Sequence, residues 1–378
     1  MKRPLNIGLI GYGINALGHK MELEQHPKLQ GRTKVKLIFD PDPKARKSQE
    51  SNEEIRFVES FEDVLDTDDL NAVIISSPPQ YHAEQAITAL ESGLHVYSEI
   101  PMSIKEEKIE KIINAEEASG KKYQLGENYC FYPEVLYAAS LVSSGRIGPT
   151  LYAESEYLHD VLYRWREGGR GDLNTPRVDS WYQQFDPLMY AHTIGPAQIA
   201  LGGLETPQPF VEVTSYANDI GGHEGKPICS PAKAFHIGLF RTKTNAIAKC
   251  ANAYIIAREP SRISIQVVGR YGTYECHEIG NPGYLFLAKD HVVTRSKHRK
   301  GKRRIVDQGI LSEIVEPIQG LYYGAQIRIM DDWLSAIEKD KTPLIDAKTG
   351  ANFCHAGIAA SKSARSGGKP TKIKIYDN

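Results

Sequence analysis

The residues best suited to move protons lie in the second half of the chain, where His192 follows Tyr190 by two positions. A neutral imidazole can accept a proton from a hydroxyl group near neutral pH. We therefore expect His192 to act as the acid–base residue, with Tyr190 as a second proton carrier. The structural alternatives are a histidine satisfied at a helix N-terminus and a tyrosine packed in the core.

A second polar cluster, Glu154-Ser-Glu-Tyr-Leu-His159-Asp160, has the alternation of a β-strand. The period of two places His159 on the face opposite to Glu154 and Glu156. His159 and Asp160, at the strand end, are expected to supply further catalytic groups, and the alternative is a solvated sheet edge. Because aromatic rings stack on polyhydroxylated ligands and arginine donates hydrogen bonds to hydroxyl groups, the expected ligand-binding residues are Tyr129, Arg164, Trp165 and Trp181.

A glycine-rich turn, Gly11-Tyr-Gly13-Ile14-Asn15-Ala16, directly follows an apolar run near the start of the chain. Its first glycine permits a tight turn, its second lets the backbone approach a pyrophosphate, and the small sixth residue lets helix and strand pack closely. The next expected strand ends at Asp40, whose carboxylate can accept hydrogen bonds from both ribose hydroxyls of an adenosine and would repel a 2′-phosphate. We therefore expect NAD rather than NADP to bind here; the alternative is an ordinary strand–turn–helix with a chance aspartate.

Alternating strands and helices must hold this loop in place. The expected strands are Leu5–Ile10, Lys34–Phe39, Ala72–Ser76, His95–Tyr97 and Tyr123–Leu125, with helices expected at Ala16–His26, His82–Ser92 and Lys105–Ser119. Such alternation indicates a doubly wound parallel sheet of Rossmann type, covered on both faces by helices. We assign this domain to residues 1–127.

The pattern changes after about residue 128, where strand-like runs follow one another. They are Leu151–Leu158, Phe210–Tyr216, Ala234–Arg241, Ala246–Ala253, Ile263–Gly269 and Gly272–His277, with helices expected at Pro133–Ser144, 323–339 and 349–364. Residues 128–378 are therefore expected to form an α+β domain built on a large, mostly antiparallel open sheet.

Two strand ends carry more specific motifs, Ile75-Ser76-Ser-Pro78-Pro-Gln-Tyr-His82 and Gly93-Leu-His-Val-Tyr-Ser-Glu99-Ile100-Pro101. Together with the glycine turn, they resemble the Gfo/Idh/MocA family (glucose–fructose oxidoreductase and inositol dehydrogenase). The resemblance implies that NAD(P) lies across the carboxyl ends of the first sheet, with a sugar, cyclitol or related polyol over the nicotinamide. It places Ser76, Pro78 and His82 along the cofactor, and Glu99 and Asn128 near the nicotinamide ribose and carboxamide.

The sequence departs from this family at one position of the second motif. The family motif is usually Glu-Lys-Pro, with the lysine over the hydroxyl being oxidised, whereas this chain has Ile100. In the family a later helix carries an aspartate and a histidine four residues apart; His192 matches the histidine, and Leu188 stands at the aspartate position. We expect His192 to take over the role of the missing lysine.

The leading interpretation is an NAD-dependent oxidoreductase that transfers a hydride at a secondary alcohol of a sugar, cyclitol or sugar derivative. One alternative is an enzyme that retains NAD and cleaves glycosides by oxidation, elimination, addition and reduction, with a second base from His159, Asp160 or the loop around His223. The other is a catalytically silent nucleotide-binding regulator.

Composition excludes several other classes. With 41% hydrophobic residues and a formal net charge of −1, the chain has no drive toward nucleic acid or acidic membranes, and the basic run Arg295–Arg304 is expected to be a solvated hairpin. The five scattered cysteines and the histidines show neither disulfide nor metal-ligand spacing. Free thiols and the lack of a membrane-spanning apolar run indicate the cytoplasm. The resemblance implies a homodimer or homotetramer formed through the C-terminal sheet.

Overall fold

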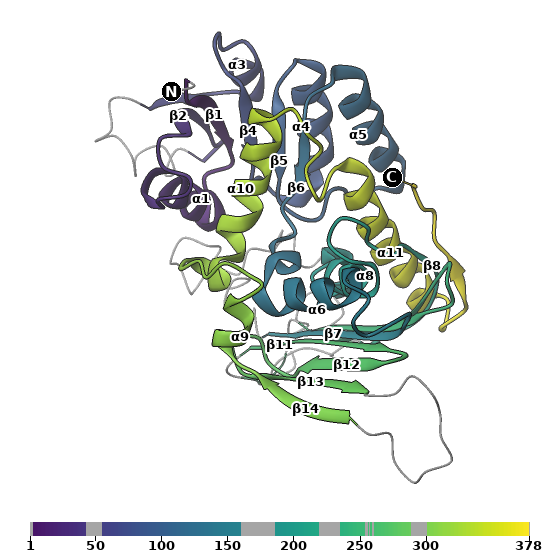
Figure 1. Ribbon diagram of the computed structural model, residues 1–378. Coiled ribbons are helices and arrows are strands. Elements are labelled where there is room, and N and C mark those ends of the chain that lie inside the picture. Colours follow the sequence, from purple (N-terminus) through teal and green to yellow (C-terminus); the bar gives the residue numbers. More distant parts are fainter. Residues whose placement is uncertain are drawn as a thin grey trace.

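Two β-sheets with helices between them organise the chain in the computed structural model (Figure 1). The structure describes residues 3–42, 55–159, 186–218, 235–253, 256, 258, 261–288 and 301–377. Of the expected site residues, Asp160, Arg164, Trp165 and Trp181 lie outside these ranges, as do the loop around His223 and most of the basic run.

The first sheet is parallel throughout, in the order β3-β2-β1-β4-β5-β6. Its apolar strands are buried from both sides because helices cover both faces. The strands are β1 (Leu5–Ile10), β2 (Thr33–Phe39), β3 (Arg56–Val58), β4 (Ala72–Ile75), β5 (His95–Ser98) and β6 (Tyr123–Leu125); the helices are α1 (Ile14–Gln25), α3 (Phe61–Leu65), α4 (Pro79–Glu91) and α5 (Glu106–Ser119). The strand order reverses between β1 and β4, and ligands of such sheets bind in the crevice at the carboxyl ends beside that point.

The second sheet has nine strands in the described residues, in the order β14-β13-β12-β11-β7-β10-β9-β8-β15. They are β7 (Thr150–Leu158), β8 (Phe210–Asn218), β9 (Phe235–Thr242), β10 (Ile247–Ala253), β11 (Arg262–Gly269), β12 (Gly272–Cys276), β13 (Gly283–Ala288), β14 (Gly301–Val306) and β15 (Thr371–Lys372). All neighbouring strands are antiparallel except β7 and β10. The expected fold class, a Rossmann domain followed by a large, mostly antiparallel sheet, is confirmed.

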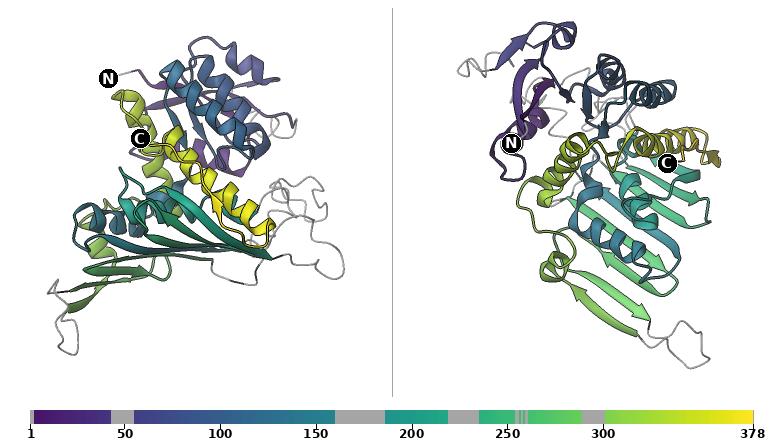
Figure 2. Two further views of the ribbon diagram at one scale, coloured as in Figure 1. Left: turned by 90° about the vertical axis from the view of Figure 1, so that its right-hand side faces the viewer. Right: turned by 45° about the horizontal axis from the view of Figure 1, so that its top comes forward.

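In the part of the chain that the structure describes, helices cover one face of the second sheet (Figure 2). On that side lie α6 (Pro133–Ser143), α8 (Ile194–Gly202) and α11 (Ala347–Arg365). The opposite face of the sheet carries the alternate side chains of each strand, and charged residues pair there. Lys249 Nζ of β10 donates to Glu154 Oε1 at 2.7 Å and to Glu156 Oε1 at 3.1 Å, both on β7. As the period of two predicts, these carboxylates face away from the helices and from His159.

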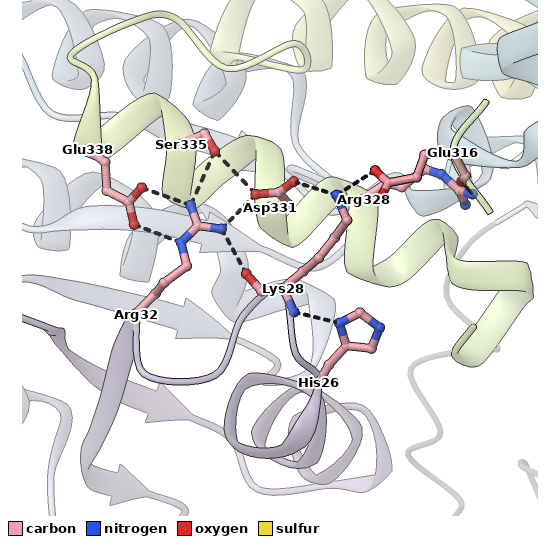
Figure 3. Close-up of polar contacts among 8 residues, drawn as sticks. All are labelled: His26, Lys28, Arg32, Glu316, Arg328, Asp331, Ser335 and Glu338. Carbon is pink, nitrogen blue, oxygen red and sulfur yellow. Dashed lines mark hydrogen bonds and ion pairs between the residues drawn. The ribbon is translucent and has the colours of Figure 1, made fainter. Parts of the chain in front are cut away.

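One late helix, α10 (Ala325–Glu338), returns to the first domain. It follows α9 (Gln308–Ser312) and the 3-10 turn η4 (Leu321–Gly324). Figure 3 shows the guanidinium of Arg32, in the turn before β2, bound between Asp331 and Glu338 of α10, at 2.6 Å and 2.8 Å. A bidentate arginine of this kind fixes geometry more strongly than a lysine would. Helix α10 is therefore fastened to the Rossmann domain along its C-terminal half.

The helix expected at 323–339 starts two residues later than predicted. Tyr322 and Tyr323 both have a φ of 55°, in the left-handed region, and Gly324 has a φ of 75°. Only glycine adopts this region without a steric cost, so η4 ends there and α10 begins at Ala325. Two consecutive strained tyrosines thus precede the helix.

Candidate active site

The glycine turn between β1 and α1 is built for a close approach of main chains. Gly11 has a φ of 82°, and a Cβ there would lie 2.7 Å from Ser76 O. A Cβ on Gly13 would meet no atom within 4 Å, so this part of the turn faces open space. The N-terminus of α1, whose cap makes no side-chain hydrogen bond, points its free N–H groups into the same space. These features fit the pyrophosphate of a dinucleotide.

Asp40 follows β2 and reaches the same turn. Its Oδ2 accepts the main-chain N–H of Tyr12 at 2.7 Å, and its Oδ1 accepts that of Asp42 at 2.8 Å. These bonds hold the carboxylate at the carboxyl end of β2, next to the glycine turn, where an adenosine ribose would lie in a Rossmann domain. The expected pairing of turn and aspartate is thus present.

The carboxyl end of β4 is held by His82 from inside the fold. Its Nδ1 lies 2.9 Å from Pro101 O and its Nε2 lies 2.7 Å from Ser77 O, so the ring joins the segments that follow β5 and β4. Burial lowers the pKa of His82. The side chain is 1% exposed, which makes His82 a support beneath Ser76 and Pro78 more than a direct contact for a cofactor.

Glu99 lies just after β5 at the same edge of the sheet. Its Oε1 is 2.5 Å from His19 Nε2, and its Oε2 is 3.5 Å from Asn15 Nδ2, both on α1. Across this edge the order is therefore Asp40 after β2, the glycine turn after β1, Ser76 after β4 and Glu99 after β5. A dinucleotide whose adenosine lies at Asp40 and whose pyrophosphate lies at the turn would bring its nicotinamide half to Glu99.

His192 forms the centre of a second group above this edge. Its Nδ1 lies 3.0 Å from Oε1 of Glu127, which is fully buried and directly follows β6. The same oxygen accepts the N–H of Tyr129 at 3.2 Å. A Cβ on Gly195, in the first turn of α8, would lie 3.2 Å from Glu127 Cγ, so this glycine lets the two segments meet. Glu127 fixes the tautomer and leaves Nε2 as the proton acceptor.

Aromatic rings surround His192. Tyr129 stacks on it with ring centroids 4.0 Å apart, and Tyr157 lies edge-on at 5.1 Å. Tyr157 Oη in turn lies 2.6 Å from His159 Nδ1, so the two predicted catalytic histidines, one just before α8 and one just after β7, share one cluster. Tyr322 of η4 adds a partly exposed ring 6.1 Å from Tyr129. Such a surface suits a polyhydroxylated ring.

Ile100, which replaces the family's lysine, and Tyr190, the predicted second proton carrier, are both buried. Ile100 is 8% exposed and belongs to the core cluster. Tyr190 lies in the 3-10 turn η3 (Pro187–Tyr190), which packs against α11, and its ring is 4% exposed. The role of Tyr190 as a second proton carrier stays a prediction.

Sequence reasoning missed three polar residues of this region. Glu127 was not singled out as a site residue, although its place directly after a parallel strand is a signal for one. His19 and Gln326 gave no local signal. Gln326 Nε2 lies 3.1 Å from both His19 Nδ1 and Tyr97 Oη, and its Oε1 accepts Asn128 Nδ2 at 3.0 Å. Within the described ranges no group of side chains could hold a metal ion, and no helix is long and apolar enough to cross a membrane.

Comparison with known sequences matches the N-terminal domain to a family and more of the chain to individual proteins. Residues 5–127 match the family model GFO_IDH_MocA, described as an oxidoreductase family with an NAD-binding Rossmann fold. A glycosyl hydrolase family 109 protein of Shewanella pealeana is 29% identical over 210 residues, 51% of this chain and 43% of that protein. An α-N-acetylgalactosaminidase of Shewanella oneidensis is 33% identical over 108 residues, 29% of this chain and 24% of that protein. The matches thus span less than half the length of these relatives.

Solved structures resemble the whole chain. Levoglucosan dehydrogenase in complex with NADH superposes with a TM-score of 0.76 at 19% identity, covering 99% of this chain and 100% of the other. The WlbA dehydrogenase of Bordetella pertussis, in complex with NADH and UDP-GlcNAcA, superposes with a TM-score of 0.75 at 18% identity, covering 100% and 99%. At this identity the likeness establishes the fold. Residues 5–127 thus match the NAD-binding Rossmann domain of the Gfo/Idh/MocA oxidoreductase family.

Proposed function

We propose that the protein is an NAD-dependent oxidoreductase that oxidises a secondary alcohol of a sugar, cyclitol or sugar derivative. The observation that carries this proposal is the pair of His192 and buried Glu127, 3.0 Å apart, at the carboxyl edge that also holds the glycine turn, Asp40 and Glu99. The pair supplies a proton acceptor where the family's usual lysine is replaced by Ile100.

In the proposed reaction, His192 Nε2 accepts the hydroxyl proton while the carbon that bears this hydroxyl group gives up a hydride. A bound nicotinamide would supply the hydride acceptor. Glu127 keeps the imidazole oriented and stabilises the positive charge that the ring gains. Tyr129 stacks on one face of the imidazole and Tyr157 lies edge-on to it, so both rings pack against His192. The product carries no added charge, because the substrate loses one proton and one hydride.

We further propose NAD as the preferred cofactor, because Asp40 places a negative charge where NADP carries its 2′-phosphate. The domain boundary is proposed at 127/128, and a second copy of the chain is the proposed partner, bound through the uncovered face of the second sheet. Localisation in the cytoplasm is proposed from the free cysteines, of which Cys130, Cys250, Cys276 and Cys354 are buried thiols.

A second candidate is an enzyme that retains NAD and cleaves a glycoside by transient oxidation. The specific observation in its favour is the similarity to glycosyl hydrolase family 109 proteins. Transient oxidation next to a C–H bond acidifies it, so a second base is needed to remove that proton. His159, joined to the His192 cluster through Tyr157, occupies a suitable place.

The two candidates give different products from one set of assays. The proposed dehydrogenase releases one NADH for each sugar oxidised, and the absorbance of NADH measures it over a panel of sugars and cyclitols. The glycosidase releases an aglycone from nitrophenyl glycosides with no net NADH, yet depends on bound NAD. Failure of the purified protein to bind NADH would refute both.

A further inference from the structure

A buried polar chain connects the cofactor edge of the first sheet to helix α10 of the second domain. Glu99 Oε1 lies 2.5 Å from His19 Nε2, and His19 Nδ1 lies 3.1 Å from Gln326 Nε2. His19 is 3% exposed and Gln326 is 5% exposed. Polar groups buried to this degree are costly unless every one is paired.

The hydrogen bonds fix the direction of each donor in this chain. Asn128 Nδ2 donates to Gln326 Oε1, which turns the amide nitrogen of Gln326 toward His19 and Tyr97. Because Gln326 Nε2 is a donor, His19 Nδ1 is the acceptor of that hydrogen bond. His19 Nε2 therefore carries the ring proton and donates a hydrogen bond to Glu99. The hydrogen bond to a carboxylate is the strong kind.

We propose that His19 and Gln326 are positioning residues for the cofactor: they hold the Glu99 carboxylate, and thereby the nicotinamide half of the dinucleotide, from the second domain. The role presupposes the nicotinamide cofactor of the proposed function. Gln326 sits on α10, so the second domain sets the geometry of a residue that follows β5. Asn128, at the crossover between the domains, is tied to the same amide.

The position of Glu99 predicts that these residues act on one half of the cofactor only. ADP carries the adenosine and the pyrophosphate, which the glycine turn and Asp40 would bind, but lacks the nicotinamide ribose. Loss of the hydrogen bonds of His19 or Gln326 should therefore weaken the binding of NADH and leave that of ADP unchanged. A general disturbance of α1 or of the domain junction would weaken both ligands alike.

The test compares dissociation constants of NADH and ADP, measured by fluorescence and calorimetry, for the full chain and its variants. His19→Leu and Gln326→Met should weaken NADH binding about tenfold and ADP binding less than about twofold. Gln326→Met has a similar length and removes the donor to His19 without adding a carboxylate that His19 could bind, so it tests the lost donor even if His19→Leu folds poorly. His19→Gln, which can still donate to Glu99, should restore most of the NADH affinity.

A matched control lies on the other contact of α10 with the first domain. Arg32→Met removes the bonds to Asp331 and Glu338 and should lower thermal stability without changing the ratio of NADH to ADP affinity. The proposal is overturned if His19→Leu and Gln326→Met bind NADH as the wild type does, or if they lose NADH and ADP affinity in equal measure. Wild-type protein that binds no NADH would instead overturn the proposed function.

Discussion

Replacing Glu127 separates the charge of its carboxylate from its orienting effect on His192. Both donors, His192 Nδ1 and the Tyr129 N–H, converge on the same oxygen, Oε1. A glutamine whose carbonyl oxygen takes that place keeps both hydrogen bonds and loses only the charge, whereas leucine loses both. Glu127→Gln and Glu127→Leu therefore measure the two contributions separately.

The buried position sets the magnitude of each effect. A hydrogen bond to a charged group is stronger than a neutral one by about 1–2 kcal/mol, so Glu127→Gln should lower the rate of hydride transfer about tenfold. In Glu127→Leu, His192 also loses the hydrogen bond that selects its tautomer and orients its ring. Removing such an orienting carboxylate from a catalytic histidine typically lowers kcat by a factor of about 10²–10⁴.

Single-turnover formation of NADH, with an oxidisable sugar identified from the panel, measures this step without interference from product release. Glu134→Gln is the matched control: Glu134 is also a buried glutamate, it accepts the Gly280 N–H at 2.9 Å, and it lies on α6 outside the site. Its rate should stay at the wild-type value. Wild-type rates in both Glu127 variants, or an equal loss in Glu134→Gln, would refute the role of Glu127.

Three further predictions concern cofactor choice, pH and backbone strain. Asp40→Asn keeps an acceptor for the Tyr12 N–H and removes the negative charge. The ratio of NADPH to NADH affinity, measured by fluorescence titration, should therefore rise about tenfold or more. An unchanged ratio would contradict the cofactor assignment. Burial raises the pKa of Glu22 to about 7, so the folded state holds this proton more tightly than the unfolded state, and stability falls as pH rises from the ordinary carboxyl pKa toward 7. The unfolding free energy of wild type relative to Glu22→Gln should thus drop by about 2 kcal/mol between about pH 5 and about pH 8 in urea denaturation, and a pH-independent difference would refute it. Tyr323→Gly should be more stable than Tyr323→Ala by about 1 kcal/mol in thermal unfolding because of the positive φ; the opposite order would show that the left-handed conformation is not kept.

Strands and glycine motifs were predictable because their signals are local. The apolar run of β1 and the turn after it identify a Rossmann start, and Asp40 is where the motif predicts an acidic residue. The parallel neighbours β7 and β10 were not foreseen, since β8, β9 and β10 form a meander whose last strand happens to join β7. When two paired strands lie about a hundred residues apart, neither segment alone shows a sequence pattern that predicts the pairing.

The site was predictable to the extent that its residues follow strands or match a motif. His192 was predicted from its residue type and the family pattern, and that role stays a prediction; its partner Glu127 lies 65 residues away. Gln326 lies 307 residues from His19. Polar pairs of this kind depend on the docking of α8 and α10, which only the assembled fold reveals. The left-handed tyrosines of η4 are likewise contrary to local preference, and tertiary contacts must hold them.

The return of α10 to the first sheet has a consequence for synthesis on the ribosome. Domains generally fold as the chain emerges, N-terminal part first. Here the groups of Arg32, His19 and Tyr97 that face α10 have their partners at residues 326–338, some two hundred residues after β6. In the nascent Rossmann domain these groups therefore stay hydrated until residues 326–338 have been synthesised. We expect the nucleotide site of this domain to mature only after α10 has been synthesised, although its own residues are made before those of the second domain.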